Sequence, residues 1–120
     1  MKVVMPYIGG VLSVNSYKIR GRGGVQTNKT KPEVELWMAE LASKVKGYRT
    51  DGNLTVELFG RFCDNRVPDL PNLHKVIGDA LKEGLGVDDR DFRFVDLGYD
   101  TDYDRPTLEI TLKGGLDEVE

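Results

Sequence analysis

The sequence is poor in the residues that build covalently linked or metal-linked scaffolds. Among its 120 residues there is one cysteine, one histidine and one tryptophan. A lone Cys63 excludes an internal disulfide and a cysteine-based zinc site, and an isolated thiol suits a reducing compartment. We therefore expect a cytoplasmic protein.

Long apolar runs are also missing. The apolar run at residues 1–6 is too short for a secretory signal, and no stretch of about 18 apolar residues occurs anywhere. The sequence thus predicts a soluble protein without a membrane partner. Domains usually contain about 100 to 150 residues, so residues 1–120 are expected to form a single domain, and a two-domain enzyme is excluded.

Charge of one sign is not in large excess over the whole chain. Seventeen Lys and Arg and twenty Asp and Glu leave a net charge of −3, so overall basicity does not indicate a nucleic-acid partner. The distribution is nevertheless uneven. Residues 1–50 carry nine basic and three acidic side chains, a net charge of +6, which leaves −9 for the remainder. Such an asymmetry between halves indicates an interaction surface.

Hydrophobic periodicity predicts four strands and two helices. The strands are expected at residues 2–8, 53–61, 92–99 and 107–112. The helices are expected from Pro32, after a capping box that starts at Thr30, to Val45, and from Pro71 to about Gly84. Residues 100–106 are expected to form a hairpin loop between the last two strands. This order predicts an α/β (α+β) fold, β-α-β-α-β-β, with two helices on a small mixed sheet.

Residues 11–31 are rich in glycine and basic side chains and show no sustained period, which predicts a long, mobile basic loop. No Gly-Lys-Ser or Gly-Lys-Thr follows its glycines, so it is not a P-loop. Such a loop can follow a phosphate backbone, and a disordered solvated loop is an equally good interpretation. The predicted contacts with a phosphate backbone are Asn15, Tyr17, Lys18, Arg20, Arg22 and Lys29 on this loop, with Arg66 and Asn72 further along.

Carboxylates gather on either side of the second predicted helix. Two precede it and three follow it: Asp64, Asp69, Asp88, Asp89 and Asp91. Carboxylate oxygens collected at one end of a sheet are hard ligands suited to Mg²⁺, and metal-assisted phosphodiester hydrolysis uses such a cluster. Composition alone favours a plainer interpretation, in which Asp69 caps the helix and residues 88–91 form a solvated turn.

One polar face of the second predicted helix carries Asn72, Lys75 and Asp79, at spacings of three and four residues. Lys75 has the charge needed to neutralise a phosphate. The alternative is an exposed ion pair between Lys75 and Asp79, worth only about 0.3 to 0.5 kcal/mol. The single His74 has no Ser or Cys partner pattern and is expected at the surface.

The run from Asp64 to Lys75 (Asp-Asn-Arg-Val-Pro-Asp-Leu-Pro-Asn-Leu-His-Lys), with Asp79-Ala80-Leu81 and then Val87-Asp88-Asp89 behind it, resembles the RusA family of Holliday junction resolvases. That family typically carries Asp-Leu-Asp-Asn-Leu, a Lys three residues after the Asn, an Asp-Ala-Leu in the same helix and an Asp-Asp pair just past it. Ser13-Val14-Asn15-Ser16-Tyr17 is similar to the family's Ser-x-Asn-x-Tyr element. The resemblance covers nearly the whole chain, and the predicted element order fits the family's fold.

The resemblance implies specific roles. Asp69, Asp89 and Lys75 match catalytic residues, and Asp69 and Asp89, with the neighbouring Asp88, match ligands of Mg²⁺, for which Mn²⁺ is a substitute. Asn72 fits the same motif. Pro71 stands where the family has its second motif Asp, so one metal-ligating carboxylate is missing. The resemblance further implies a homodimer that nicks four-way DNA junctions in recombination and repair, of a kind often encoded by phages and prophages.

The leading hypothesis is therefore a Mg²⁺-dependent, structure-specific endonuclease that cleaves Holliday junctions or other branched DNA. The first alternative is a catalytically impaired RusA-like DNA-binding protein, disabled at Pro71. The second is an α/β interaction module without a nucleic-acid role. Metal-dependent cleavage of a synthetic junction separates the first hypothesis from the others, and salt-dependent junction binding separates the two alternatives.

Overall fold

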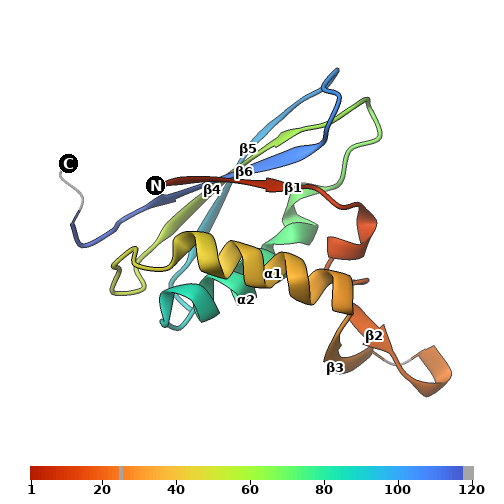
Figure 1. The fold of residues 1–120 in the computed structure, drawn as a ribbon, viewed down its shortest axis with the longest axis horizontal. Helices are drawn as coiled ribbons and strands as arrows, with labels where there is room; N and C mark the ends of the chain where they lie inside the picture. The colour runs from red at the N-terminus through yellow and green to blue at the C-terminus, as the bar shows by residue number, and fades with distance from the viewer. Residues whose placement is uncertain (25, 118–120) are drawn as a thin grey trace.

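A four-stranded sheet with two helices on one side of it forms the body of the protein (Figure 1). The computed structural model describes residues 1–24 and 26–117. The strands are β1 (Lys2–Pro6), β2 (Lys18–Arg20), β3 (Gln26–Thr30), β4 (Thr55–Arg61), β5 (Arg93–Asp100) and β6 (Thr107–Lys113). The helices are α1 (Pro32–Val45) and α2 (His74–Leu85), and the 3₁₀ turns are η1 (Gly10–Leu12), η2 (Arg22–Gly24) and η3 (Leu70–Leu73).

The sheet is mixed, with the strand order β1-β6-β4-β5. β4 pairs with β5 in parallel and with β6 antiparallel, and β1 pairs antiparallel with β6. The α+β class and the mixed sheet are confirmed. The predicted hairpin at residues 100–106 is wrong, because β4 lies between β5 and β6. A parallel pair needs a crossover connection, here α2, and that crossover places β5 at the edge, so β6 pairs with the opposite side of β4.

Alternation along β4 sorts its side chains between the two faces of the sheet, as predicted. Val56, Leu58 and Gly60 are buried on the helix side, and the residues between them are partly exposed on the open side. The buried side chains of β4 and its neighbours meet those of both helices in one hydrophobic core. Since both helices pack on one face, the other face of the sheet has no helix over it (Figure 1).

Helix α1 has the predicted bounds, but the residue that precedes it caps it differently from the prediction. Its N-cap is Lys31, which makes no side-chain capping hydrogen bond, and Pro32 occupies the first turn. The predicted capping box at Thr30 is wrong. Thr30 belongs to β3, and its hydroxyl oxygen accepts a hydrogen bond from Lys18 Nζ at 3.2 Å. Proline fits the first turn because no helical partner exists there for the missing N–H.

Helix α2 begins three residues later than predicted, at His74. Pro71 lies instead in the first turn of η3, which leads directly into α2. The helix ends at Gly86, whose left-handed conformation (φ 69°) allows its N–H to close the last turn on Lys82. None of the helices in the described ranges is long and apolar enough to cross a membrane.

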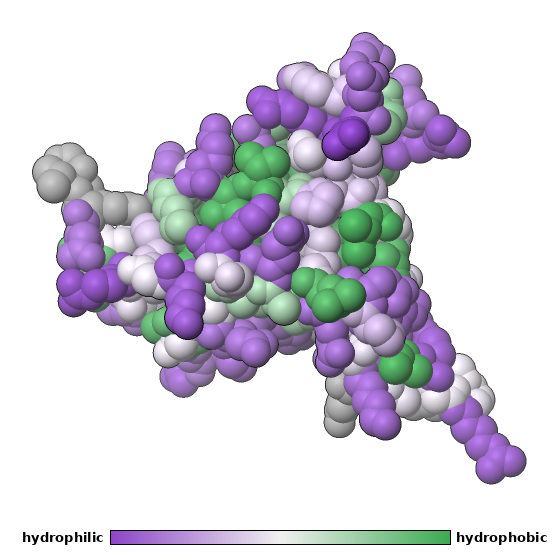
Figure 2. Space-filling view, in the orientation of Figure 1, coloured by the Kyte–Doolittle hydropathy of each residue, from purple (hydrophilic) through white to green (hydrophobic). Residues whose placement is uncertain are grey.

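The predicted mobile loop contains a β-hairpin, which we call the arm and define as residues 18–30. β2 and β3 pair antiparallel, with Lys18 opposite Thr30. Thr27 Oγ1 donates to the Ile19 carbonyl at 2.7 Å. The arm projects away from the body (Figures 1 and 2). Sequence periodicity missed it because a two-stranded ribbon outside the core needs no continuous apolar face.

Helices α1 and α2 approach each other closely at Gly84. A Cβ at Gly84 would lie 2.6 Å from the Ala42 carbonyl oxygen and 2.7 Å from Ala42 Cα, both main-chain atoms of α1. Helix propensity alone favours alanine by up to about 1 kcal/mol, but overpacking against a backbone costs about 1 to 3 kcal/mol. We expect Gly84→Ala to lower the free energy of unfolding by about 1 to 2 kcal/mol in urea titrations.

A matched control for that prediction is Gly10→Ala. A Cβ at Gly10 would have no atom within 4 Å. The unfolding free energy of this variant should stay within about 0.5 kcal/mol of wild type. Equal stabilities for the Gly84 and Gly10 variants would show that the helices can separate without cost.

Candidate functional site

Two segments that are far apart in the sequence meet at the start of α2. The Val14 N–H donates to the Asn72 carbonyl at 2.8 Å. The Tyr17 hydroxyl donates to Asp79 Oδ2 at 3.0 Å, and Lys75 Nζ donates to Asp79 Oδ1 at 3.1 Å. The ion pair foreseen between Lys75 and Asp79 is thus present. The structure therefore brings the Ser-x-Asn-x-Tyr element against the helix that carries the motif lysine.

Tyr17 is buried, with only 3 % of its surface exposed. Burial raises the pKa of its hydroxyl to about 12, and the charge and hydrogen bond of Asp79 act in the same direction. The hydroxyl is therefore a protonated donor throughout the neutral range. Because the ring faces the interior, the prediction that Tyr17 contacts DNA directly has no exposed side chain to support it.

Asp69 lies just before η3, and Asp89 lies in the turn that follows α2. Asp69 precedes η3, and its carbonyl, but not its carboxylate, accepts the Asn72 N–H at 2.9 Å, so the side-chain cap considered for Asp69 is absent. The carboxylate of Asp89 packs against α2, since a Cβ at Gly78 would lie 3.7 Å from Asp89 Oδ2. Gly78 follows Lys75 by three residues, so Asp89 lies beside the helix surface that carries Lys75.

Asp88 faces Arg90. Its Oδ1 accepts the Arg90 N–H at 3.1 Å, and its Oδ2 accepts the guanidinium at 3.0 Å. These hydrogen bonds from Arg90 hold the pKa of Asp88 below its usual value. Asp88 also lines a shallow hollow of about 630 Å³ on the outer surface of α2. The hollow is bounded by Asp79, Lys82, Glu83, Gly86, Val87 and Asp88. Asp88 therefore shares one surface with Asp79, although its charge is already partnered.

The predicted metal ligands do not form a preformed cage. Among the residues that the structure describes, no three His, Cys, Asp or Glu side chains converge closely enough to hold a metal ion. Mg²⁺ in proteins is often held by only one or two carboxylates, together with water and substrate phosphates. Asp69 and Asp89 supply such hard oxygen donors, and Asp88 a third that is paired with Arg90. The donor chemistry therefore fits a hard divalent cation whose coordination is completed by water and a bound phosphate group.

His74 has a partner that the sequence reading missed. Its Nε2 lies 2.8 Å from Asp96 Oδ1, and its ring stacks on Phe94 with centroids 4.3 Å apart. The alternation of side chains along β5 could have indicated that Phe94 and Asp96 face the helices. Phe94 and Asp96 are opposite the buried Val56 and Leu58, so both lie on the helix side of the sheet. The pair anchors the first turn of α2 to the edge strand.

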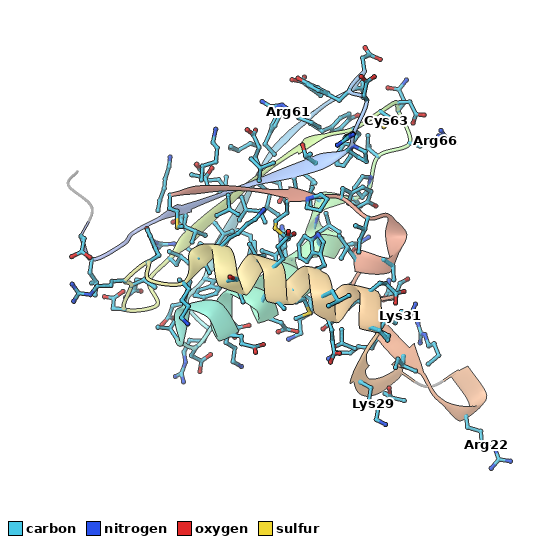
Figure 3. The ribbon with its side chains drawn as sticks, in the orientation of Figure 1. Arg22, Lys29, Lys31, Arg61, Cys63 and Arg66 are labelled. Carbon is cyan, nitrogen blue, oxygen red and sulfur yellow. The ribbon has the colours of Figure 1, made fainter. Side chains whose placement is uncertain are left out.

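Basic side chains on the arm are presented in two ways. Arg20 is held against the arm, donating to the Asn15 carbonyl at 2.7 Å and to the Gly24 carbonyl at 3.1 Å. Arg22 is exposed and extends outward at the tip of the arm, and Lys29 is exposed on its side (Figure 3). The arm therefore presents exposed positive charge at its tip and side, at a distance from the body.

Arg66 lies apart from the arm, on the loop after β4 (Figure 3). Its guanidinium pairs with Asp64 through Nη2 at 2.6 Å and Nε at 3.1 Å. These hydrogen bonds lower the pKa of Asp64 to about 2, so its carboxylate stays charged in the neutral range. Asp64 is consequently paired with Arg66, whose side chain nevertheless stays largely exposed to solvent.

A comparison with known protein families shows which family shares these residues. A model of the family described as "Endodeoxyribonuclease RusA" matches residues 17–113. The chain belongs to the RusA family. The matched range contains the arm, both helices and the strands β4 to β6, so it covers the tyrosine, the lysine and the aspartates described above. A comparison with curated proteins found no match.

RusA proteins are endodeoxyribonucleases that resolve Holliday junctions and generally depend on a divalent metal. Membership confirms the resemblance inferred from the motif run at residues 64–89. It also agrees with the observed α+β architecture.

Proposed function

We propose that this RusA family member is a Mg²⁺-dependent, structure-specific endonuclease that cleaves Holliday junctions or other branched DNA in recombination and repair. The observation that carries the proposal is the family match over residues 17–113, which contains Asp69, Lys75 and Asp89 along one helix and its flanks. The exposed thiol of Cys63 suits the reducing cytoplasm, where we propose that the protein acts.

The proposed roles follow from the chemistry of each side chain. Asp69 and Asp89, with Asp88, would hold the Mg²⁺ ion, which when bound polarises the phosphodiester and supplies an activated water. Lys75 is more than half exposed, so its ammonium can reach a phosphate and offset the negative charge that develops during cleavage. Asn72 lies in the turn before Lys75 and is proposed to contact the same strand.

The arm is proposed to hold the DNA backbone. Asn15 at its base and Arg20, Arg22 and Lys29 on it are exposed, and Lys18 is partly exposed, so their polar groups can reach a phosphate backbone. We assign this role to Asn15, Lys18, Arg20, Arg22 and Lys29, with Arg66 as a contact from the loop after β4. Carboxylates repel DNA unless metal neutralises them, so binding and cleavage are expected to separate by mutation.

Replacing Arg20 and Arg22 together with alanine tests the arm. Two lost phosphate contacts should flatten the plot of log K against log salt concentration by about 1.8 and weaken binding roughly tenfold or more near 100 mM salt. Fluorescence anisotropy with a labelled four-way junction measures both. Lys2→Ala with Lys113→Ala removes the same charge from the open sheet face and should leave the slope nearly unchanged. Equal slopes for the two double variants would contradict the arm assignment.

A nicking assay tests the whole proposal. A synthetic four-way junction, labelled on each strand in turn, should be nicked in Mg²⁺ or Mn²⁺ and left intact in EDTA.

A second function, junction binding without cleavage, is favoured by one specific observation. Pro71 is exposed at the start of η3 and offers no side-chain oxygen ligand in place of the family's Asp. Tight binding with no nicking at any metal concentration would support this second function.

We also propose a homodimer, since a twofold enzyme suits a twofold junction. The edge strand β5 exposes Val95, Leu97 and Tyr99, and β1 exposes Val4 on the uncovered face of the sheet. Apolar side chains along an unpaired edge favour association. Light scattering at micromolar concentration should give a particle of about twice 13.4 kDa. A particle of 13.4 kDa would contradict the dimer and the simplest route to paired nicks.

A further inference from the structure

We infer that Tyr17 is a positioning residue for Lys75 and that it acts through Asp79. The inference rests on the proposed function in one respect, because it assumes that Lys75 acts on the scissile phosphate. The family motif contains the lysine and the Asp-Ala-Leu element, but it does not say what holds the ammonium in place. The structure assigns that task to a bridge from Tyr17 to Asp79 to Lys75.

The bridge uses both oxygens of one carboxylate. Asp79 Oδ2 accepts the Tyr17 hydroxyl at 3.0 Å, and Asp79 Oδ1 accepts Lys75 Nζ at 3.1 Å. Neither donor displaces the other, so both hydrogen bonds form at the same time. Tyr17 is 62 residues from Asp79 in the sequence, whereas Lys75 is one helical turn before it. The carboxylate is therefore held from outside its own helix.

Burial separates this bridge from an ordinary surface ion pair. An exposed Lys–Asp pair four residues apart on a helix is weak, because both side chains keep much of their freedom. Here the carboxylate of Asp79 is only 22 % exposed and the donor on its other oxygen is almost fully buried. The hydrogen bond from this phenol is partly buried, so water competes for it less than at an open surface, and the bond restricts the rotation of the carboxylate and, through it, the position of the ammonium.

Tyr17 also closes the base of the arm. Its carbonyl accepts the Lys31 N–H at 2.9 Å, directly outside the pairing of Lys18 with Thr30. The residue that positions Lys75 is thus the residue from which the arm extends. The proposed DNA-binding and cleaving parts of the protein are joined at this point by hydrogen bonds.

A double-mutant cycle on cleavage tests the inference. Tyr17→Phe keeps the buried ring and removes one hydrogen bond, so the single-turnover nicking rate should fall about fivefold to tenfold, with the junction Kd changed by less than about twofold. In a Lys75→Gln background the same change should have no further effect on the rate. A merely structural role for Tyr17 would reduce the rate equally in both backgrounds, and that result would overturn the inference, as would a wild-type rate for Tyr17→Phe.

The matched control is Tyr48→Phe. This change removes another phenol, whose hydroxyl lies 3.5 Å from the Leu112 carbonyl, away from Asp79. It should leave the nicking rate within about twofold of wild type, since this hydrogen bond is long and does not involve the site. A loss equal to that of Tyr17→Phe would overturn the inference, because the hydroxyl of a tyrosine away from Asp79 would then matter as much.

A second measurement decides the inference even if the protein does not nick DNA. Relaxation of the ¹⁵N-labelled lysine ammonium groups reports how firmly each is held in the free protein. The order parameter of Lys75 should fall in Tyr17→Phe, while that of Lys113, which pairs with Glu57 at 3.1 Å, should not change. An unchanged Lys75 order parameter would overturn the inference. Absence of nicking by wild type would count against the proposed function alone.

Discussion

Replacing Asp89 with asparagine is expected to lower junction cleavage at least about a hundredfold while junction binding stays intact or becomes tighter. Loss of even an outer-shell partner of a metal ligand typically costs 10- to 100-fold, so loss of a ligand itself should cost at least as much. Binding improves because one negative charge near the DNA backbone disappears. Asparagine has nearly the same shape, so the packing of residue 89 against Gly78 is kept.

The measurement is a single-turnover nicking rate at saturating Mg²⁺, with binding followed in EDTA. Asp91→Asn is the matched control, because Asp91 lies in the same turn and is exposed. Its rate should stay close to wild type. Nicking rates that are equal in the Asp89 and Asp91 variants would remove Asp89 from the site. Far-ultraviolet circular dichroism and urea titration of both variants separate a chemical defect from unfolding.

Replacing Pro71 with aspartate is expected to increase metal affinity and cleavage. The structure puts Pro71 in the first turn of η3, exposed, directly after Asp69 and Leu70. A carboxylate there adds a second anionic oxygen donor close to Asp69, and affinity for hard cations rises with the number of charged ligands. The Mg²⁺ concentration for half-maximal nicking should fall roughly tenfold. The extra freedom of the unfolded chain should cost about 0.4 to 1 kcal/mol of stability.

A Mg²⁺ and Mn²⁺ titration of nicking measures this effect. Asn65→Asp is the control, since it adds the same charge to the exposed loop before Asp69 without approaching the helix. It should leave the metal dependence unchanged. Identical titrations for wild type and Pro71→Asp would show that position 71 is irrelevant and that another residue completes the site. Cleavage by neither protein would favour the function of binding without cleavage.

Local features of the fold followed from the sequence because each depends on neighbours in the chain. Helix α1 ended at Val45 as its apolar spacing predicted, and alternation along β4 separated the faces of the sheet correctly. The ion pair of Lys75 with Asp79 followed from helical spacing alone. The motif run at residues 64–89 was sufficient to indicate the RusA family, which the match over residues 17–113 confirms. In each case, residues that lie close together in the sequence are sufficient for the prediction.

Pairing between distant segments was decided only by the tertiary structure. Alternation in β5 and β6 predicted two strands, but not that β4 separates them, because a period reports that a strand is half-buried and not which strand bonds to it. The arm left no periodic signal because it lies outside the core.

The contacts of Tyr17 with Asp79 and of His74 with Asp96 also depend on the packing of α2 against other segments. The sequence by itself therefore determined both helices, the four strands of the main sheet, the family and the candidate aspartates and lysine. The tertiary structure decided which side chains hold one another, because a hydrogen bond between residues 17 and 79 forms only once the whole core has brought their segments together.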